Sequence, residues 1–328
     1  MVRGSLYLGR SFLGSKDCGY NLIGSWLLIL GSVNINPLAL LLSGDVMNFL
    51  AIGMGLYAGL TVYLGFAVLA IRNISRERMG MLNAIAGGLL GYLFAEISVE
   101  LVEKPEEMAR KGMWVDYIVY AVTTSLALIA TLVGLAYLER YMKTRRPNSK
   151  DWARVGMRMD PWTLSLLLAI GLGIHNLGEG LGIGSAISIE DLGLALLLSI
   201  GFAIHNITEG FAISSPLLAV RLAESLPDGG SIHDSRRLAT RLLILGAIAG
   251  LPTALGALVL SSIPPNELVL DVGMTAAAGS IIYAVFNMNL SALGQLKGDP
   301  VKFWISIFTG FLIAISVETA LAAMNIPI

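Results

Sequence analysis

The chain has 328 residues, of which 55% are hydrophobic and only 14% are charged. A water-soluble domain of this size needs far more surface charge, so the composition excludes a soluble globular protein. The net charge of -1 indicates neither a nucleic-acid partner nor an acidic substrate, and the single cysteine, Cys18, excludes an intramolecular disulfide and a multi-thiolate metal cluster.

Apolar runs of about 20 residues recur along the chain between short polar stretches, a pattern typical of membrane-spanning helices. We predict an all-α, polytopic membrane helix bundle. Its eight core helices are expected at residues 46–71, 80–102, 113–138, 161–187, 191–219, 239–262, 268–293 and 302–325.

The chain is predicted to divide into an N-terminal extension, residues 1–45, and an eight-helix core, residues 46–328. The extension holds a further apolar stretch, residues 22–43, which Asn34, Asn36 and Pro37 interrupt. Four interpretations stay open for it: a ninth membrane span, a peripheral helix, a leader, or sequence upstream of the true start.

The basic residues lie mostly on one side of the predicted bundle. Of the 22 lysines and arginines, 19 lie in the segments 1–21, 72–79, 139–160, 220–241 and 294–302, which alternate to that side. Because positive loops are retained in the cytoplasm, we expect a multi-pass protein of the cell membrane with its C-terminus outside.

Two similar motifs lie in the fourth and fifth predicted helices: HNLGEG at 175–180 and HNITEG at 205–210. These helices are consecutive and so run antiparallel. His175 and His205 each lie 14 residues after the predicted start of their helix. At about 1.5 Å per residue both reach about 21 Å into a core about 30 Å thick, so the motifs are predicted to meet near the midplane.

A weaker similarity relates AGGLLGYLF at 86–94 to AGSIIYAVF at 278–286. It favours two inverted three-helix repeats that flank the central pair, a three-two-three organisation common in transporters. The alternative is a chance likeness between apolar helices.

On a helix, residues four apart share a face, so His175 lies beside Glu179 and His205 beside Glu209. Carboxylates in hydrocarbon are costly unless they find a cation, and two glutamates balance the charge of one divalent ion. We therefore predict that these four side chains bind one ion, with ligand types that suit zinc or a similar first-row metal. The alternative is a buried polar network that only holds the helices together.

At these motifs the chain resembles the ZIP family of divalent metal transporters. The resemblance implies a metal site that often holds two ions, with His175, Glu179 and Glu209 as ligands of the primary ion and His205 as a fourth. Asn176 and Asn206, with the shared glutamates, would hold the second ion of a binuclear site.

The chain departs from the family pattern at three points. Gly178 and Thr208 replace the usual motif proline, the sixth helix has no acidic residue, and the seventh carries Asn287 and Asn289 where relatives often have a glutamate. These two asparagines, deep in an inward-running helix, are candidates for the cytoplasmic exit.

Three further acidic residues are predicted between the midplane and the outer surface. Glu96 and Glu318 lie about 24 Å along helices that start inside, and Glu100 lies one turn beyond Glu96. They are candidates for an acidic entrance that attracts cations. The alternative is that they are protonated or paired near the interface.

The sequence thus favours uptake of a divalent transition metal into the cytoplasm. Zinc, iron and manganese are the leading candidates, with cadmium, cobalt and nickel behind them. We expect no cofactor, no enzymatic activity and no nucleic-acid partner. The chain lacks a Walker motif, GxxxxGK[ST], so we expect no ATP hydrolysis by this chain. The expected partners are the metal ion, the lipid bilayer and, as an open alternative, a second copy of the chain. Two other functions stay open: an intramembrane zinc hydrolase, and a metal-binding sensor.

Overall fold

The computed structural model describes residues 37–71, 74–145, 150–224, 235–263 and 266–323. Every regular element in these ranges is helical, and eight helical spans are long and apolar enough to cross a membrane. They are Val46–Ala70, Arg76–Arg110, Trp114–Arg145, Pro161–Ser188, Leu192–Val220, Leu238–Ser262, Glu267–Gln295 and Pro300–Ala320. Each coincides with a predicted helix, which confirms the all-α, multi-pass membrane bundle.

The elements in chain order are α2 (Pro37–Leu60), α3 (Val62–Gly65), η1 (Phe66–Ala70), α4 (Arg76–Arg110), α5 (Trp114–Arg145), α6 (Lys150–Arg154), α7 (Pro161–Ser188), α8 (Leu192–Ser214), η2 (Ser215–Leu217), α9 (Leu218–Glu224), α10 (Ser235–Ser262), α11 (Glu267–Gln295) and α12 (Pro300–Ala323). The first span combines α2, α3 and η1, and the fifth combines α8, η2 and the start of α9.

The first helix begins earlier than predicted, at Pro37, inside the N-terminal extension. Proline suits the first turn of a helix, because the missing N–H is not needed there and the ring fixes φ near about −65°. Pro37, one of the residues that interrupt the apolar stretch in the sequence, is thus the first residue of α2. Residues 1–36, with Cys18 and most of the candidate ninth span, lie outside the described residues.

Two helices extend beyond their predicted apolar limits. α4 continues to Arg110 rather than 102, and α5 to Arg145 rather than 138. Ion pairs between residues four apart support these polar ends: Lys111 pairs with Glu107, and Lys143 with Glu139. Hydropathy marks where the lipid ends, whereas the backbone hydrogen bonds of the helix continue into the polar region.

Aspartate caps set the start of both motif helices. The Asp160 side chain accepts a hydrogen bond from the Thr163 N–H at 2.9 Å, and the Asp191 side chain accepts one from the Leu194 N–H at 2.9 Å. His175 then lies 14 residues after the start of α7 and His205 lies 13 residues after the start of α8. Both motifs therefore lie near mid-depth in antiparallel helices, as predicted.

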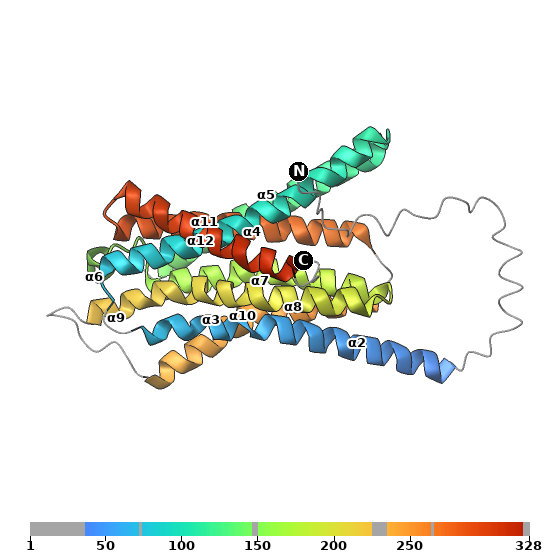
Figure 1. Cartoon of the computed structure of the whole chain (residues 1–328), viewed down its shortest axis with the longest axis horizontal. Helices are drawn as coiled ribbons and strands as arrows, with labels where there is room; N and C mark the ends of the chain where they lie inside the picture. Colours follow the sequence, from blue (N-terminus) through green and yellow to red (C-terminus); the bar gives the residue numbers. More distant parts are fainter. Residues whose placement is uncertain (1–36, 72–73, 146–149, 225–234, 264–265, 324–328) are drawn as a thin grey trace, which may run out of the picture.

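The eight spans pack as two groups. The first helix group is α2, α7, α8 and α10, and the second helix group is α4, α5, α11 and α12. The most extensive contact between the groups is α7 against α11. In Figure 1, α7 and α8 lie between α2 and α10 on one side and α4, α11 and α12 on the other. α7 is the central helix, with 72% of its apolar window buried against 11% for α5.

The contacts between the helices have the symmetry expected of an inverted repeat. α7 packs on α10 as α8 packs on α2, and α4 packs on α12 as α11 packs on α5. Exchanging α2 with α10, α4 with α11, α5 with α12 and α7 with α8 leaves this set of contacts unchanged. The packing therefore agrees with the predicted three-two-three organisation.

Glycines let the helices of the first group approach closely. A Cβ atom at Gly59 would lie 2.0 Å from the Gly250 carbonyl oxygen, and one at Gly250 would lie 2.2 Å from the Gly59 oxygen. The motif glycines behave alike: a Cβ at Gly180 would lie 2.0 Å from the Thr253 oxygen, and one at Gly210 would lie 1.9 Å from the Val62 oxygen. Backbone contacts of this kind stabilise helix pairs in membranes. They explain why each motif ends in glycine.

We predict opposite effects of two glycine substitutions in α2. Gly59→Ala places a methyl group against the α10 backbone and should destabilise the protein by about 1–3 kcal/mol. Gly53→Ala meets nothing within 4 Å and should be neutral or stabilising by up to about 1 kcal/mol, because alanine favours helix. The thermal unfolding midpoint in detergent measures both. If both variants shifted the unfolding midpoint by the same amount and in the same direction, the close α2–α10 contact would be contradicted.

Candidate metal centre

Three side chains of the paired motifs converge in the middle of the bundle. α7 supplies His175 and Glu179, one turn apart on the same face, and α8 supplies Glu209. Each offers one ligand atom, and these atoms all lie within 4.8 Å of one another.

The spacing of these atoms fits a small ion between them. His175 Nε2 lies 3.3 Å from Glu179 Oε1 and 3.4 Å from Glu209 Oε1. Nitrogen and oxygen ligands bind zinc at about 2.0–2.1 Å, and two such ligands of a tetrahedral ion are about 3.4 Å apart. The distances from the imidazole to both carboxylates thus match those around a tetrahedral ion.

Burial makes this cluster costly without a counter-charge. The side chains of His175, Glu179 and Glu209 are 3%, 4% and 0% exposed. Both imidazole nitrogens, both oxygens of Glu209 and Oε1 of Glu179 have no hydrogen-bond partner among the described residues. Buried polar atoms of this kind are rare unless something else satisfies them, and a divalent cation would neutralise two carboxylates.

The motif asparagines tie the two site helices to their neighbours. Asn176 Nδ2 donates to the Ala249 carbonyl in α10 at 3.0 Å, and Asn206 Nδ2 donates to the Ala58 carbonyl in α2 at 3.1 Å. Asn206 also donates to Glu179 Oε2 at 3.4 Å and so orients that carboxylate. The Oδ1 atoms of both asparagines have no hydrogen-bond partner among the described residues. Each amide therefore positions the site through the hydrogen bonds of its nitrogen, and its oxygen is available as an acceptor or ligand. Binding of a second ion by these asparagines stays a prediction.

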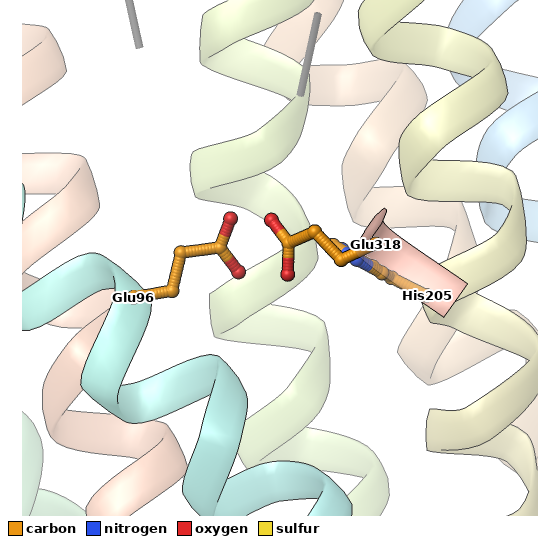
Figure 2. Close-up of side chains that lie close together, drawn as sticks. All are labelled: Glu96, His205 and Glu318. Atoms are coloured by element: carbon orange, nitrogen blue, oxygen red, sulfur yellow. The ribbon is translucent and has the colours of Figure 1, made fainter. Parts of the chain in front are cut away.

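The fourth predicted ligand, His205, does not join the cluster of His175. It lies instead with Glu96 of α4 and Glu318 of α12, whose ligand atoms and its own are all within 4.8 Å of one another. Figure 2 shows the two carboxylates pointing toward each other, with the imidazole of His205 beside Glu318. The prediction of four side chains around one ion is therefore not what the structure shows.

The orientation of α8 accounts for this difference. Hydrogen bonds from Thr61 to the Ala203 carbonyl at 2.6 Å and from Asn206 to Ala58 tie α8 to the first span. With α8 held there, Glu209 meets His175 of α7, and His205, one turn earlier, meets the second helix group. Sequence spacing gives the face and depth of a side chain, but not which neighbour that face meets.

The remaining predicted residues lie on the expected helices. Glu96 and Glu318, predicted at an outer entrance, adjoin His205, whereas the side chain of Glu100 is outside the described part of α4. Asn287 donates to the Tyr283 carbonyl of its own helix at 3.1 Å. A Cβ at Gly87 of α4 would lie 2.2 Å from Oδ1 of Asn289, so that side chain packs against α4. The exit role of both asparagines stays a prediction.

The cluster of Glu96, His205 and Glu318 is the feature that sequence reasoning missed. One signal was available, because Glu96 and Glu318 lie at equal distances along helices that start on the same side. That spacing predicts one depth for the two carboxylates, but nothing in the sequence indicates that α8 turns its histidine toward them.

No protein-family model matches the chain, and no curated protein matches it.

Proposed function

We propose that this protein is a ZIP-like transporter that carries divalent transition-metal ions through the membrane. The observation that supports this most is the buried set of one imidazole and two carboxylates at mid-depth in a bundle of eight spans. Ionisable groups at such a depth usually belong to an ion pathway.

The site would exchange the water shell of the ion for protein ligands. His175 contributes a neutral nitrogen donor, and Glu179 and Glu209 contribute the two charges that offset those of the ion. The bound unit is then electrically neutral, which lowers the cost of holding a dication in a low-dielectric interior. The amides of Asn176 and Asn206 fix the helices that carry these ligands.

The division into two helix groups suits an elevator-like step, in which the first helix group carries the ion past the second. The α7–α11 interface is lined by small residues at several points, with Gly178 facing Ala277 and Gly171 facing the Ser280 backbone. Small side chains interlock little, so one helix can shift along the other at low cost. This arrangement supports alternating access to the site from the two sides.

The ligand types favour first-row metals. Zinc, iron and manganese are the proposed substrates, with cadmium, cobalt and nickel as weaker candidates. Imidazole and carboxylate ligands discriminate poorly between these ions, so availability in the cell would decide which one is carried.

A second candidate function, an intramembrane zinc hydrolase, is favoured by one observation. Three protein ligands plus an open position for water is the usual arrangement at a catalytic zinc, and His175, Glu179 and Glu209 are three. Chelator-sensitive hydrolysis of a lipid or peptide by the purified protein would support this alternative, and metal flux without hydrolysis would exclude it.

Transport is tested by uptake of ⁶⁵Zn²⁺ into proteoliposomes. Combined Glu179→Ala and Glu209→Ala substitution should reduce the initial rate by more than about 100-fold, because even residues that only orient metal ligands contribute 10- to 100-fold to affinity. The matched control is Glu103→Ala with Glu106→Ala, which removes two exposed acids from α4 and should leave uptake unchanged. Uptake at the wild-type rate in the first variant would contradict the proposal.

We further propose that the basic loops face the cytoplasm and that transport is directed inward. A tag appended after Ile328 should then be accessible to an impermeant reagent on intact cells, whereas a tag inserted at residues 146–149 should become accessible only after permeabilisation. The reverse pattern would contradict this orientation.

A further inference from the structure

A second cluster of metal-ligand side chains lies between the two helix groups. It consists of Glu96 on α4, His205 on α8 and Glu318 on α12, all partly buried (Figure 2). We propose that these three residues form a second divalent-cation site, distinct from the site of His175, Glu179 and Glu209. The proposal rests on the proposed function for the identity of the ion and for the role of the site in transport, but not for the site itself.

The side chains offer the chemistry that a metal ion needs. Two carboxylates supply the charge and an imidazole supplies a nitrogen donor, so the cluster repeats the donor set of the first site with residues from three other positions. Nδ1 of His205 and Oε2 of Glu318 are buried and have no hydrogen-bond partner among the described residues. Both types of donor therefore have an atom available for an ion.

A neighbouring contact holds the two carboxylate helices in place. The rings of Tyr92 on α4 and Phe311 on α12 pack edge to face with centroids 5.2 Å apart. This contact joins α4 to α12 beside the cluster.

The position of the cluster gives it a role in the transport cycle. His205 belongs to the first helix group, whereas Glu96 and Glu318 belong to the second. An ion bound by all three residues would link the groups in the arrangement seen here, and it would have to leave before they move apart. His205 is also one turn from Glu209, so these two residues, one from each site, lie about 6 Å apart along the axis of α8.

The test is the number of Zn²⁺ ions bound per full-length chain in detergent, measured by equilibrium dialysis and elemental analysis. The wild type should bind two ions. Glu96→Gln with Glu318→Gln should bind one, Glu179→Gln with Glu209→Gln should bind one, and the quadruple variant should bind none. The control Glu103→Gln with Glu106→Gln should bind two.

Glutamine retains the volume of glutamate, and size-exclusion chromatography with a thermal unfolding midpoint verifies the fold of each variant. The second site would be overturned if the Glu96→Gln, Glu318→Gln variant bound two ions, as the wild type is expected to. It would also be overturned if the wild type bound one ion and this variant still bound that ion. Loss of one ion from that variant would support the second site even if the liposomes showed no uptake, so the two proposals fail separately.

Discussion

The rest of the structure depends on two carboxylates buried at mid-depth in a membrane bundle beside one imidazole. Glu179 and Glu209 lie together around His175 with almost no exposure, although isolated carboxylates in hydrocarbon are strongly disfavoured and repel each other. A divalent cation satisfies both constraints at once. The spacing of the donor atoms, 3.3 and 3.4 Å from the imidazole nitrogen, is that of ligands around one small ion.

Several local features of the sequence serve to bring these groups together. Aspartate caps start α7 and α8, glycines at the ends of both motifs allow their helices to contact neighbouring backbones, and the motif asparagines fix each helix to α10 or α2. Each residue type in HNxxEG therefore has a physical role. Histidine and glutamate provide nitrogen and oxygen ligand atoms, asparagine donates a hydrogen bond to a carbonyl of a neighbouring helix, and glycine allows the helix backbones to approach closely.

Much of this could be predicted from the sequence, because membrane helices are governed by hydropathy and by a fixed rise per residue. The eight spans, the shared depth of the motifs and the pairing of His175 with Glu179 all follow from those rules. The placement of His205 does not, since it depends on how α8 is rotated by contacts with Ala58 and Thr61. For the same reason Glu96 and Glu318 could be given a depth but not a partner. Helix limits also differed at Pro37, where a residue that breaks helices elsewhere begins one.

The most direct test of the central claim is zinc K-edge X-ray absorption on the full chain with one equivalent of Zn²⁺. In the Glu96→Gln, Glu318→Gln background, which removes the second cluster, we expect nitrogen and oxygen ligands at about 2.0–2.1 Å with outer-shell scattering from one imidazole. That scattering should disappear when His175→Ala is added. A site made of His175, Glu179 and Glu209 would be contradicted if imidazole scattering remained after His175→Ala. It would also be contradicted if the protein that retains His175 showed oxygen ligands alone.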